Sequence, residues 1–156
     1  MRITRYSDYS LRVLMYLAAR PGRTATIAEI SRAYGISKAH LMKVVHELGR
    51  TGFLTTRRGR GGGLHLARTP DEIRVGDVVR QTEDPVDLVE CFDPATSQCR
   101  IERICALRGV LDEALETFLA TLDGYTLADL VRRRRAPLLA LLSTPRSDPS
   151  TGELRG

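Results

Sequence analysis

The sequence contains no tryptophan, and aromatic residues make up 5% of its 156 positions. Few large rings are therefore available to line a pocket for a sugar or an aromatic ligand. Long apolar runs are missing too, because Asp8 and Arg12 interrupt the apolar stretch near the start and no run reaches the length of a membrane span. We expect a cytoplasmic chain with no leader and no membrane contact, folded either as one compact domain of ordinary size or as a small domain with an attached oligomerisation element.

Signatures of catalysis are equally scarce. The chain has no C-x-x-C pair, no paired acid and base, and no second domain that would form a pocket, which argues against a thiol oxidoreductase or an iron-sulfur hydro-lyase. The glycine-rich GRGGGL lacks the Gly-Lys-Ser/Thr of a nucleotide-binding loop. His40, His46 and His65 lack the spacing of metal ligands. The sequence therefore predicts a protein that is not an enzyme.

Acidic residues are few in the first half of the chain. Residues 1–82 hold fifteen Arg or Lys and six Asp or Glu, a net charge of +9. Residues 83–131 hold three and eleven, a net charge of −8, and residues 132–156 have a net charge of +4. A basic front with an acidic middle predicts that a polyanion binds the front. The arginine run at 132–135 fits either an extra phosphate contact or a solvated helix end.

Helical periodicity and capping signals divide the front of the chain. Apolar residues recur at helical spacing over about 7–20. Thr26 and Glu29 stand in capping-box register before a short helix that Gly35 ends, and Ser37 can cap the next helix. Two helices joined by a short glycine-containing turn predict a helix-turn-helix. The following FLTTRRGRGGGLHLAR predicts a β-hairpin with a basic, glycine-rich tip.

The remaining elements flank a segment that holds all the cysteines. VGDVVRQTE predicts a short helix, and an apolar stripe from Ile104 to Leu122 predicts a helix of roughly 22 residues that a second copy of the chain would cover. Thr126 with Asp129 can cap a last helix. The expected fold is mainly α with a small β-hairpin wing. It comprises a winged helix-turn-helix domain (1–82), a cysteine-containing loop (83–106), a dimerisation helix and a C-terminal helix (107–142), and a disordered tail (143–156).

The order of capping box, turn, basic helix and basic hairpin favours DNA binding over a merely solvated charged face. The second helix of a helix-turn-helix places its N-terminal residues in the major groove of double-stranded DNA. Arginines on a flexible hairpin suit phosphates or the adjacent minor groove. The predicted DNA contacts are Ser37, Lys38, Ala39, His40, Lys43, Arg57, Arg58 and Arg60.

Cys91, Cys99 and Cys105 all lie within CFDPATSQCRIERIC. An odd number of cysteines favours reduced thiols, which select zinc, copper(I) or iron-sulfur clusters. Structural zinc commonly uses closer pairs and four protein ligands, and this chain offers no fourth thiol or nearby histidine. On spacing alone, an iron-sulfur cluster, a zinc ion and three unrelated buried thiols all stay open.

The order of these parts resembles winged-helix transcription regulators of the NsrR and IscR type. The resemblance covers about residues 1–131 and rests on MRITRYSDYSLRVLMYLA, the reader TIAEISRAYGISKAHLMKVVHELGRTGFL, the wing RGRGGGLHLAR, and three cysteines before a long helix. ALETFLATLDGYTLADL is most similar to the nitric oxide-sensing NsrR branch. The resemblance implies a homodimer with one iron-sulfur cluster per subunit, [4Fe-4S] rather than [2Fe-2S], bound through Cys91, Cys99 and Cys105.

The resemblance is less explicit about the fourth cluster ligand. IscR-like members place a histidine three residues beyond the last cysteine, where this chain has Arg108, so an oxygen donor is left. The resemblance points to Asp8, supplied by the partner subunit. An aspartate in a first helical turn also stabilises the helix dipole and pairs with Arg12, which is the plain alternative. Three further carboxylates compete for the role: Glu90, Asp93 and Glu102.

The function implied by the resemblance is a dimeric repressor that binds a palindromic operator and releases it when nitric oxide reacts with the cluster. The same fold could instead sense iron supply, cluster supply or redox state. A DNA-binding protein with structural zinc is the alternative from a different class.

Overall fold

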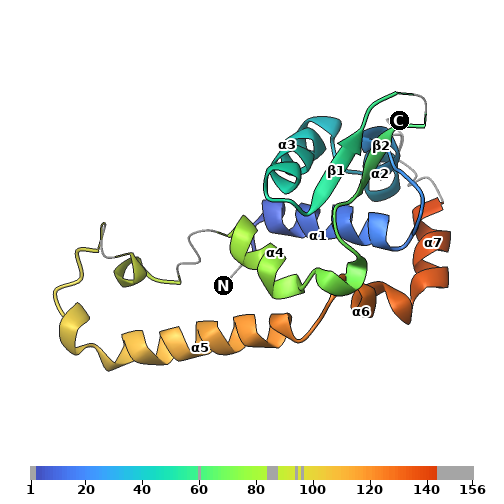
Figure 1. Ribbon diagram of the computed structural model, residues 1–156. Coiled ribbons are helices and arrows are strands. Elements are labelled where there is room, and N and C mark those ends of the chain that lie inside the picture. Colours follow the sequence, from blue (N-terminus) through green and yellow to red (C-terminus); the bar gives the residue numbers. More distant parts are fainter. Residues whose placement is uncertain (1–2, 60, 84–87, 94, 96, 144–156) are drawn as a thin grey trace, which may run out of the picture.

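The computed structural model describes residues 3–59, 61–83, 88–93, 95 and 97–143. That part of the chain contains seven helices and a two-stranded antiparallel hairpin, which lies on one side of the molecule next to α3 (Figure 1), so the mainly helical fold class with a hairpin wing is confirmed. The helices and strands are α1 (Arg5–Ala18), α2 (Ile27–Tyr34), α3 (Lys38–Arg50), β1 (Leu54–Arg57), β2 (Gly63–Leu66), α4 (Val75–Thr82), α5 (Ala106–Asp123), α6 (Leu127–Arg132) and α7 (Arg135–Ser143). Short 3₁₀ helices are η1 (Pro70–Glu72), η2 (Glu90–Phe92) and η3 (Glu102–Ile104).

α2 and α3 form the helix-turn-helix that the sequence predicts. The Thr26 hydroxyl accepts the Glu29 N–H at 3.2 Å while Glu29 Oε2 accepts the Thr26 N–H at 2.6 Å, which makes the expected capping box. Gly35 ends α2 in the left-handed conformation, with φ 67°. The Ser37 hydroxyl then caps α3 by accepting the His40 N–H at 3.3 Å.

The hairpin is anchored at its base and leaves its basic tip exposed. Leu54 pairs with Leu66 at the base. Ala25 adds a short third pairing, because its N–H and carbonyl exchange hydrogen bonds with Leu64 at 3.0 and 2.7 Å. Leu54 and Leu64 are buried, so the wing projects from the core itself.

α1 runs through the middle of the molecule, with α3 and the hairpin along one side and α4 and α6 along the other (Figure 1). Its buried side chains Val13 and Leu14 are fully enclosed by these elements. Leu127 on α6 and Leu142 on α7 join the same core cluster. α6 and α7 therefore contribute to the hydrophobic core that supports the helix-turn-helix.

The single last helix expected after residue 126 is wrong, since the structure has both α6 and α7. A continuous helix would need an N–H at position 137 to donate to the carbonyl of Arg133, and Pro137 has none. Proline is instead tolerated in the first turn of a new helix, which is where α7 places it. Arg135 fixes the start of α7 by donating to the Ala19 carbonyl at 2.9 Å.

α5 is 18 residues long rather than roughly 22, because residues 102–104 form a separate 3₁₀ turn and Cys105 is extended. Part of α5 packs on α4, while its N-terminal end and the cysteine-containing segment reach away from the other helices (Figure 1). There, Ile104, Leu107 and Val110 are 86%, 61% and 61% exposed. None of the described helices combines the length and apolar character needed to cross a membrane.

Candidate functional site

The predicted DNA contacts of the reader lie exposed around the start of α3: Ser37, Lys38, Ala39, His40 and Lys43. Two of them are already engaged. The Ser37 hydroxyl caps the helix and lies 2.9 Å from His40 Nδ1, and the imidazole also faces the Tyr9 ring at a centroid distance of 6.2 Å. The side chains left to reach outward are therefore those of Lys38, Ala39 and Lys43.

Sequence reasoning missed three exposed residues on α3: Met42, His46 and Arg50. Met42 and His46 lie three and seven positions beyond Ala39, so they share its side of the helix. The same i, i+3, i+7 spacing that identified the buried face would have found them. Met42, His46 and Arg50 also line an open groove between α3 and β1.

The wing carries a concentrated positive charge. Arg57 and Arg58 are exposed, and the predicted contact Arg60 lies outside the described residues. The sequence from 53 to 68 contains four arginines and no acidic residue. Gly59 and Gly61 have φ values of 96° and 79°. Residues other than glycine rarely adopt such values, so the sharp turn at the tip depends on glycine. The tip can thus bring its arginines close to a polyanion.

The three thiols are free, but a single chain does not gather them into a site. Cys91 is buried in η2, while Cys99 and Cys105 are half-buried. Among the residues that the structure describes, no three Cys, His, Asp or Glu side chains are close enough to hold one metal ion. The described residues of the segment from Cys91 to Cys105 form only short 3₁₀ helices. As soft donors, three thiols on such a segment fit a metal or cluster that organises the segment around itself.

Asp8 makes the local contact that the plain alternative predicts. Its Oδ1 accepts from Arg12 Nε at 2.8 Å, and both side chains are about two-fifths exposed. The Arg12 guanidinium also lies 5.9 Å from the centre of the Tyr34 ring on α2. Burial raises the pKa of Tyr34 to about 12, so this phenol stays neutral and Asp8 balances the arginine charge.

The competing carboxylates differ in the hydrogen bonds and ion pairs that they already make. Glu102 accepts from the Ser97 hydroxyl at 2.7 Å and pairs with Arg108 at 3.7 Å. Arg108 is thus paired with a carboxylate. Asp93 Oδ1 accepts from the Ala95 N–H at 2.9 Å, and Glu90 is exposed.

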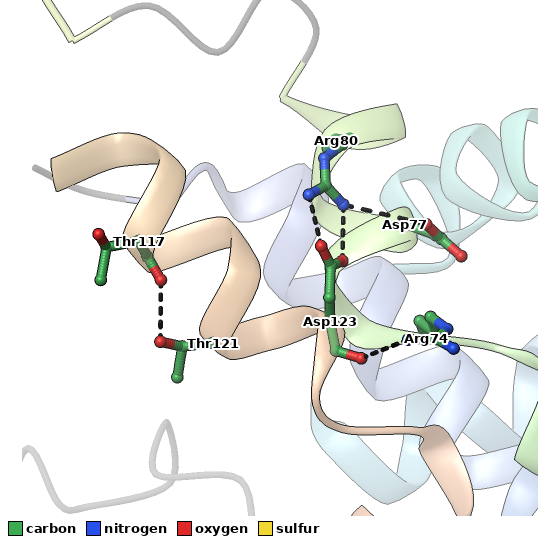
Figure 2. A network of polar contacts seen from close by, with 6 residues as sticks. All are labelled: Arg74, Asp77, Arg80, Thr117, Thr121 and Asp123. Atoms are coloured by element: carbon green, nitrogen blue, oxygen red, sulfur yellow. Dashed lines mark hydrogen bonds and ion pairs between the residues drawn. The ribbon is translucent and has the colours of Figure 1, made fainter. Parts of the chain in front are cut away.

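α4 is tied to the end of α5 by a bidentate ion pair (Figure 2). Arg80 Nη1 and Nη2 donate to the two carboxylate oxygens of Asp123 at 2.7 and 2.6 Å, and Arg74 donates to the Asp123 carbonyl at 3.0 Å. The hydrogen bonds from Arg80 lower the pKa of Asp123. Gly76 makes the approach possible, because a Cβ there would lie 1.9 Å from Asp123 Oδ1. The pair joins residues 43 positions apart.

The C-terminal end of α4 is also tied to the start of α1. Glu83 Oε1 accepts the Thr4 N–H at 2.7 Å and contacts the buried Ser7 hydroxyl, which also lies 2.7 Å from the Thr82 hydroxyl. The Thr4 hydroxyl in turn accepts the Ser7 N–H at 3.2 Å, so α1 begins at Arg5 rather than at the expected residue 7. α4 therefore contacts both the helix that carries Asp8 and the helix that follows the cysteines.

These features match a known family. A family model named Rrf2 and described as iron-dependent transcriptional regulator matches residues 3–133. The chain belongs to the Rrf2 family. It is 53% identical over 135 residues to the HTH-type transcriptional regulator NsrR of Bacillus subtilis, an alignment that covers 86% of this chain and 92% of that protein.

Solved structures agree on the fold. A transcriptional regulator from Listeria innocua superposes with a TM-score of 0.69 at 25% identity, covering 100% of this chain and 96% of that one. IscR from T. potens superposes with a TM-score of 0.68 at 22% identity, over 85% and 88%. The predictions of a winged-helix fold and of a DNA-binding transcriptional regulator that is not an enzyme are confirmed.

Proposed function

We propose that the chain is a homodimeric repressor whose iron-sulfur cluster responds to nitric oxide. The observation that carries the proposal is the position of Cys91, Cys99 and Cys105. These free thiols lie between α4 and α5, outside the reader but connected to it by two helices. The 53% identity to a regulator named NsrR supports the assignment.

A second copy of the chain is the proposed cover for the apolar stripe of α5. Leu107 and Val110 on α5, and Ile104 in the 3₁₀ turn just before it, are at least 61% exposed. Burying such side chains contributes roughly 1.5–3 kcal/mol each, and a two-fold dimer buries every one of them twice. α5 is therefore proposed as the dimerisation helix.

The dimer is proposed to bind a palindromic operator in double-stranded DNA. Two copies of α3 related by a two-fold axis match half-sites about 34 Å apart. Lys38 and Lys43 would contact phosphates or base edges from α3, with Ser37, Ala39 and His40 beside them. Arg57, Arg58 and Arg60 would follow the backbone or enter the minor groove from the wing.

Cys91, Cys99 and Cys105 would hold the cluster, with Asp8 of the partner subunit as the fourth ligand. A [4Fe-4S] cluster is favoured over [2Fe-2S] by the resemblance to NsrR; in it, each of the three thiolates and the carboxylate would hold one iron. When bound, the cluster would supply the iron at which nitric oxide reacts. The three cysteines would anchor it on a segment whose described part contains short 3₁₀ helices and no α-helix or strand.

We propose that Asp8 leaves Arg12 when it binds a partner's cluster. The guanidinium would then lose its 2.8 Å partner while remaining beside Tyr34 on the first helix of the helix-turn-helix. Gain or loss of the cluster would in this way change contacts of the reader. A hundredfold change in operator affinity needs about 2.8 kcal/mol of coupling, within the range that allosteric proteins show.

The test begins with protein purified without oxygen, its visible absorption spectrum, and its iron and sulfide content. Nitric oxide is then titrated in while DNA binding is followed by fluorescence anisotropy. We expect brown protein that loses its cluster absorption and its DNA together. Colourless, zinc-loaded protein that keeps its DNA would establish the structural-zinc alternative instead. Release of DNA by iron chelators or oxygen, but not by nitric oxide, would establish sensing of iron supply or redox state.

Site variants sharpen this test. Cys99→Ala should abolish the cluster and the specific DNA binding while the protein stays dimeric, whereas the exposed Gln98→Ala should behave as the parent protein. Asp8→Ala should alter the cluster spectrum without unfolding the chain. An unchanged spectrum and nitric oxide response in Asp8→Ala would assign Asp8 to its pairing with Arg12 alone.

A further inference from the structure

One exposed apolar side chain lies on the basic face of the reader. Met42 on α3 is 60% exposed. In the described part of residues 3–82, the other exposed large apolar residue is Ile3, at 38%, ahead of α1. Removing an apolar side chain from water is favourable, so a partner that covered Met42 would bind more tightly. The position of Met42 indicates what that partner is.

The Met42 side chain lies on the side of α3 that is next to the wing. It lines the open groove that α3 forms with β1, together with Lys43, His46, Thr55 and Thr56. Ala39 precedes it by one turn on the exposed side of the helix. Side chains in the first half of a recognition helix are the ones that reach base edges.

The charge around the groove selects DNA as its occupant. Lys38 and Lys43 flank Met42 on α3, and Arg57 is exposed on the neighbouring strand. The acidic residue that lines the groove, Glu47, is paired with Arg50 at 2.8 Å. An apolar protein partner would have to desolvate this basic rim, whereas a phosphodiester backbone complements it.

Thymine offers a methionine a specific contact in the major groove. Of the four bases, thymine alone presents a 5-methyl group there, and apolar side chains recognise it by contact. A methionine is unbranched and flexible, so its thioether can adapt to one methyl group or to two adjacent ones. We propose that Met42 reads thymine 5-methyl groups and thereby contributes to the choice of operator. This inference rests on the proposed binding of operator DNA.

The experiment compares thymine with uracil, which lacks only that methyl group. High-affinity duplexes are first selected from a randomised pool with the full-length, cluster-loaded dimer. Each thymine is then replaced in turn by uracil, and the dissociation constants of both duplexes are measured. For the parent protein, we expect uracil at one or two positions to weaken binding about fourfold, the effect of one methyl group withdrawn from water.

Variants assign the effect to the side chain. In Met42→Ala, the uracil-to-thymine ratio at those positions should fall to one, and Met42→Leu should retain it because leucine is also apolar. Leu141→Ala is the matched control, since Leu141 is 73% exposed on α7. A parent protein indifferent to uracil, or an unchanged ratio in Met42→Ala, would overturn the inference while leaving DNA binding intact. Failure to select any duplex would overturn the proposed function itself.

Discussion

Gly76→Ala is expected to weaken the packing of α4 on α5, although alanine normally stabilises a helix. Gly76 is buried on α4, and a Cβ there would lie 1.9 Å from Asp123 Oδ1, 2.9 Å from Asp123 Cγ and 3.0 Å from Arg80 Nη1. Carbon and oxygen atoms in contact are about 3.3 Å apart, so the carboxylate would have to move by about 1.4 Å. Such a movement breaks the hydrogen bonds to Arg80 at 2.6 and 2.7 Å.

Gly109→Ala provides the matched control for the magnitude. Gly109 lies inside α5, and a Cβ there would meet nothing within 4 Å. This substitution should raise the free energy of unfolding by the helix propensity difference of about 1 kcal/mol. Gly76→Ala has the same gain but also an overpacking cost of roughly 1–3 kcal/mol, so the two variants should differ by that amount.

The assay is urea unfolding followed by circular dichroism, at one fixed protein concentration because the chain is proposed to dimerise. A double-mutant cycle tests the cause. In an Asp123→Ala background the carboxylate is gone, and Gly76→Ala should stabilise by about 1 kcal/mol as Gly109→Ala does. The reasoning is refuted if Gly76→Ala alone stabilises the protein as much as Gly109→Ala.

Three further outcomes follow from the same contacts. The lowered pKa of Asp123 means that its pairing with Arg80 stabilises the fold above the ordinary carboxyl pKa of about 4 and is lost as the pH falls through the folded value, so Asp123→Asn should flatten this part of the acid-unfolding curve. Thr126→Ala, which removes the cap of α6, should cost about 1 kcal/mol in urea unfolding, and Thr126→Ser should restore it. Leu107→Glu should convert the proposed dimer to monomers in analytical ultracentrifugation, with helix content retained; a dimer of parent-like stability would place the interface elsewhere.

Local signals account for most of what the sequence predicted correctly. The capping boxes at Thr26 and Thr126 join residues three positions apart, so the residue types at fixed spacing identify them. The Ser37 cap and the turn at Gly35 are equally local. The separation of α6 from α7 was missed, although Pro137 is a local signal that excludes a continuous helix through the arginine run.

Contacts between distant residues were not readable in this way. The Arg80–Asp123 pair joins positions 43 apart, and the contact between Glu83 and Ser7 joins positions 76 apart. Neither pair has a spacing that marks it in a sequence. Gly76 likewise resembles an ordinary helix-weakening glycine until the carboxylate beside it is located. The cysteine ligand set stays a prediction, because the described residues of one chain do not gather the three thiols at a metal site.

Besides the proposed contact of Asp8, α4 offers a second route by which the proposed cluster would act on the helix-turn-helix. The cysteine-containing segment has two connections to the rest of the chain, one leaving the end of α4 and one through α5, which packs on α4. Arg80 and Glu83 fasten α4 to α5 and to α1 respectively. A displacement of the cysteines through either connection therefore acts on α4, and α4 packs on α1, which packs on the recognition helix. Because interiors are close-packed, a shift of α4 has to be accommodated by α1 and passed to α3.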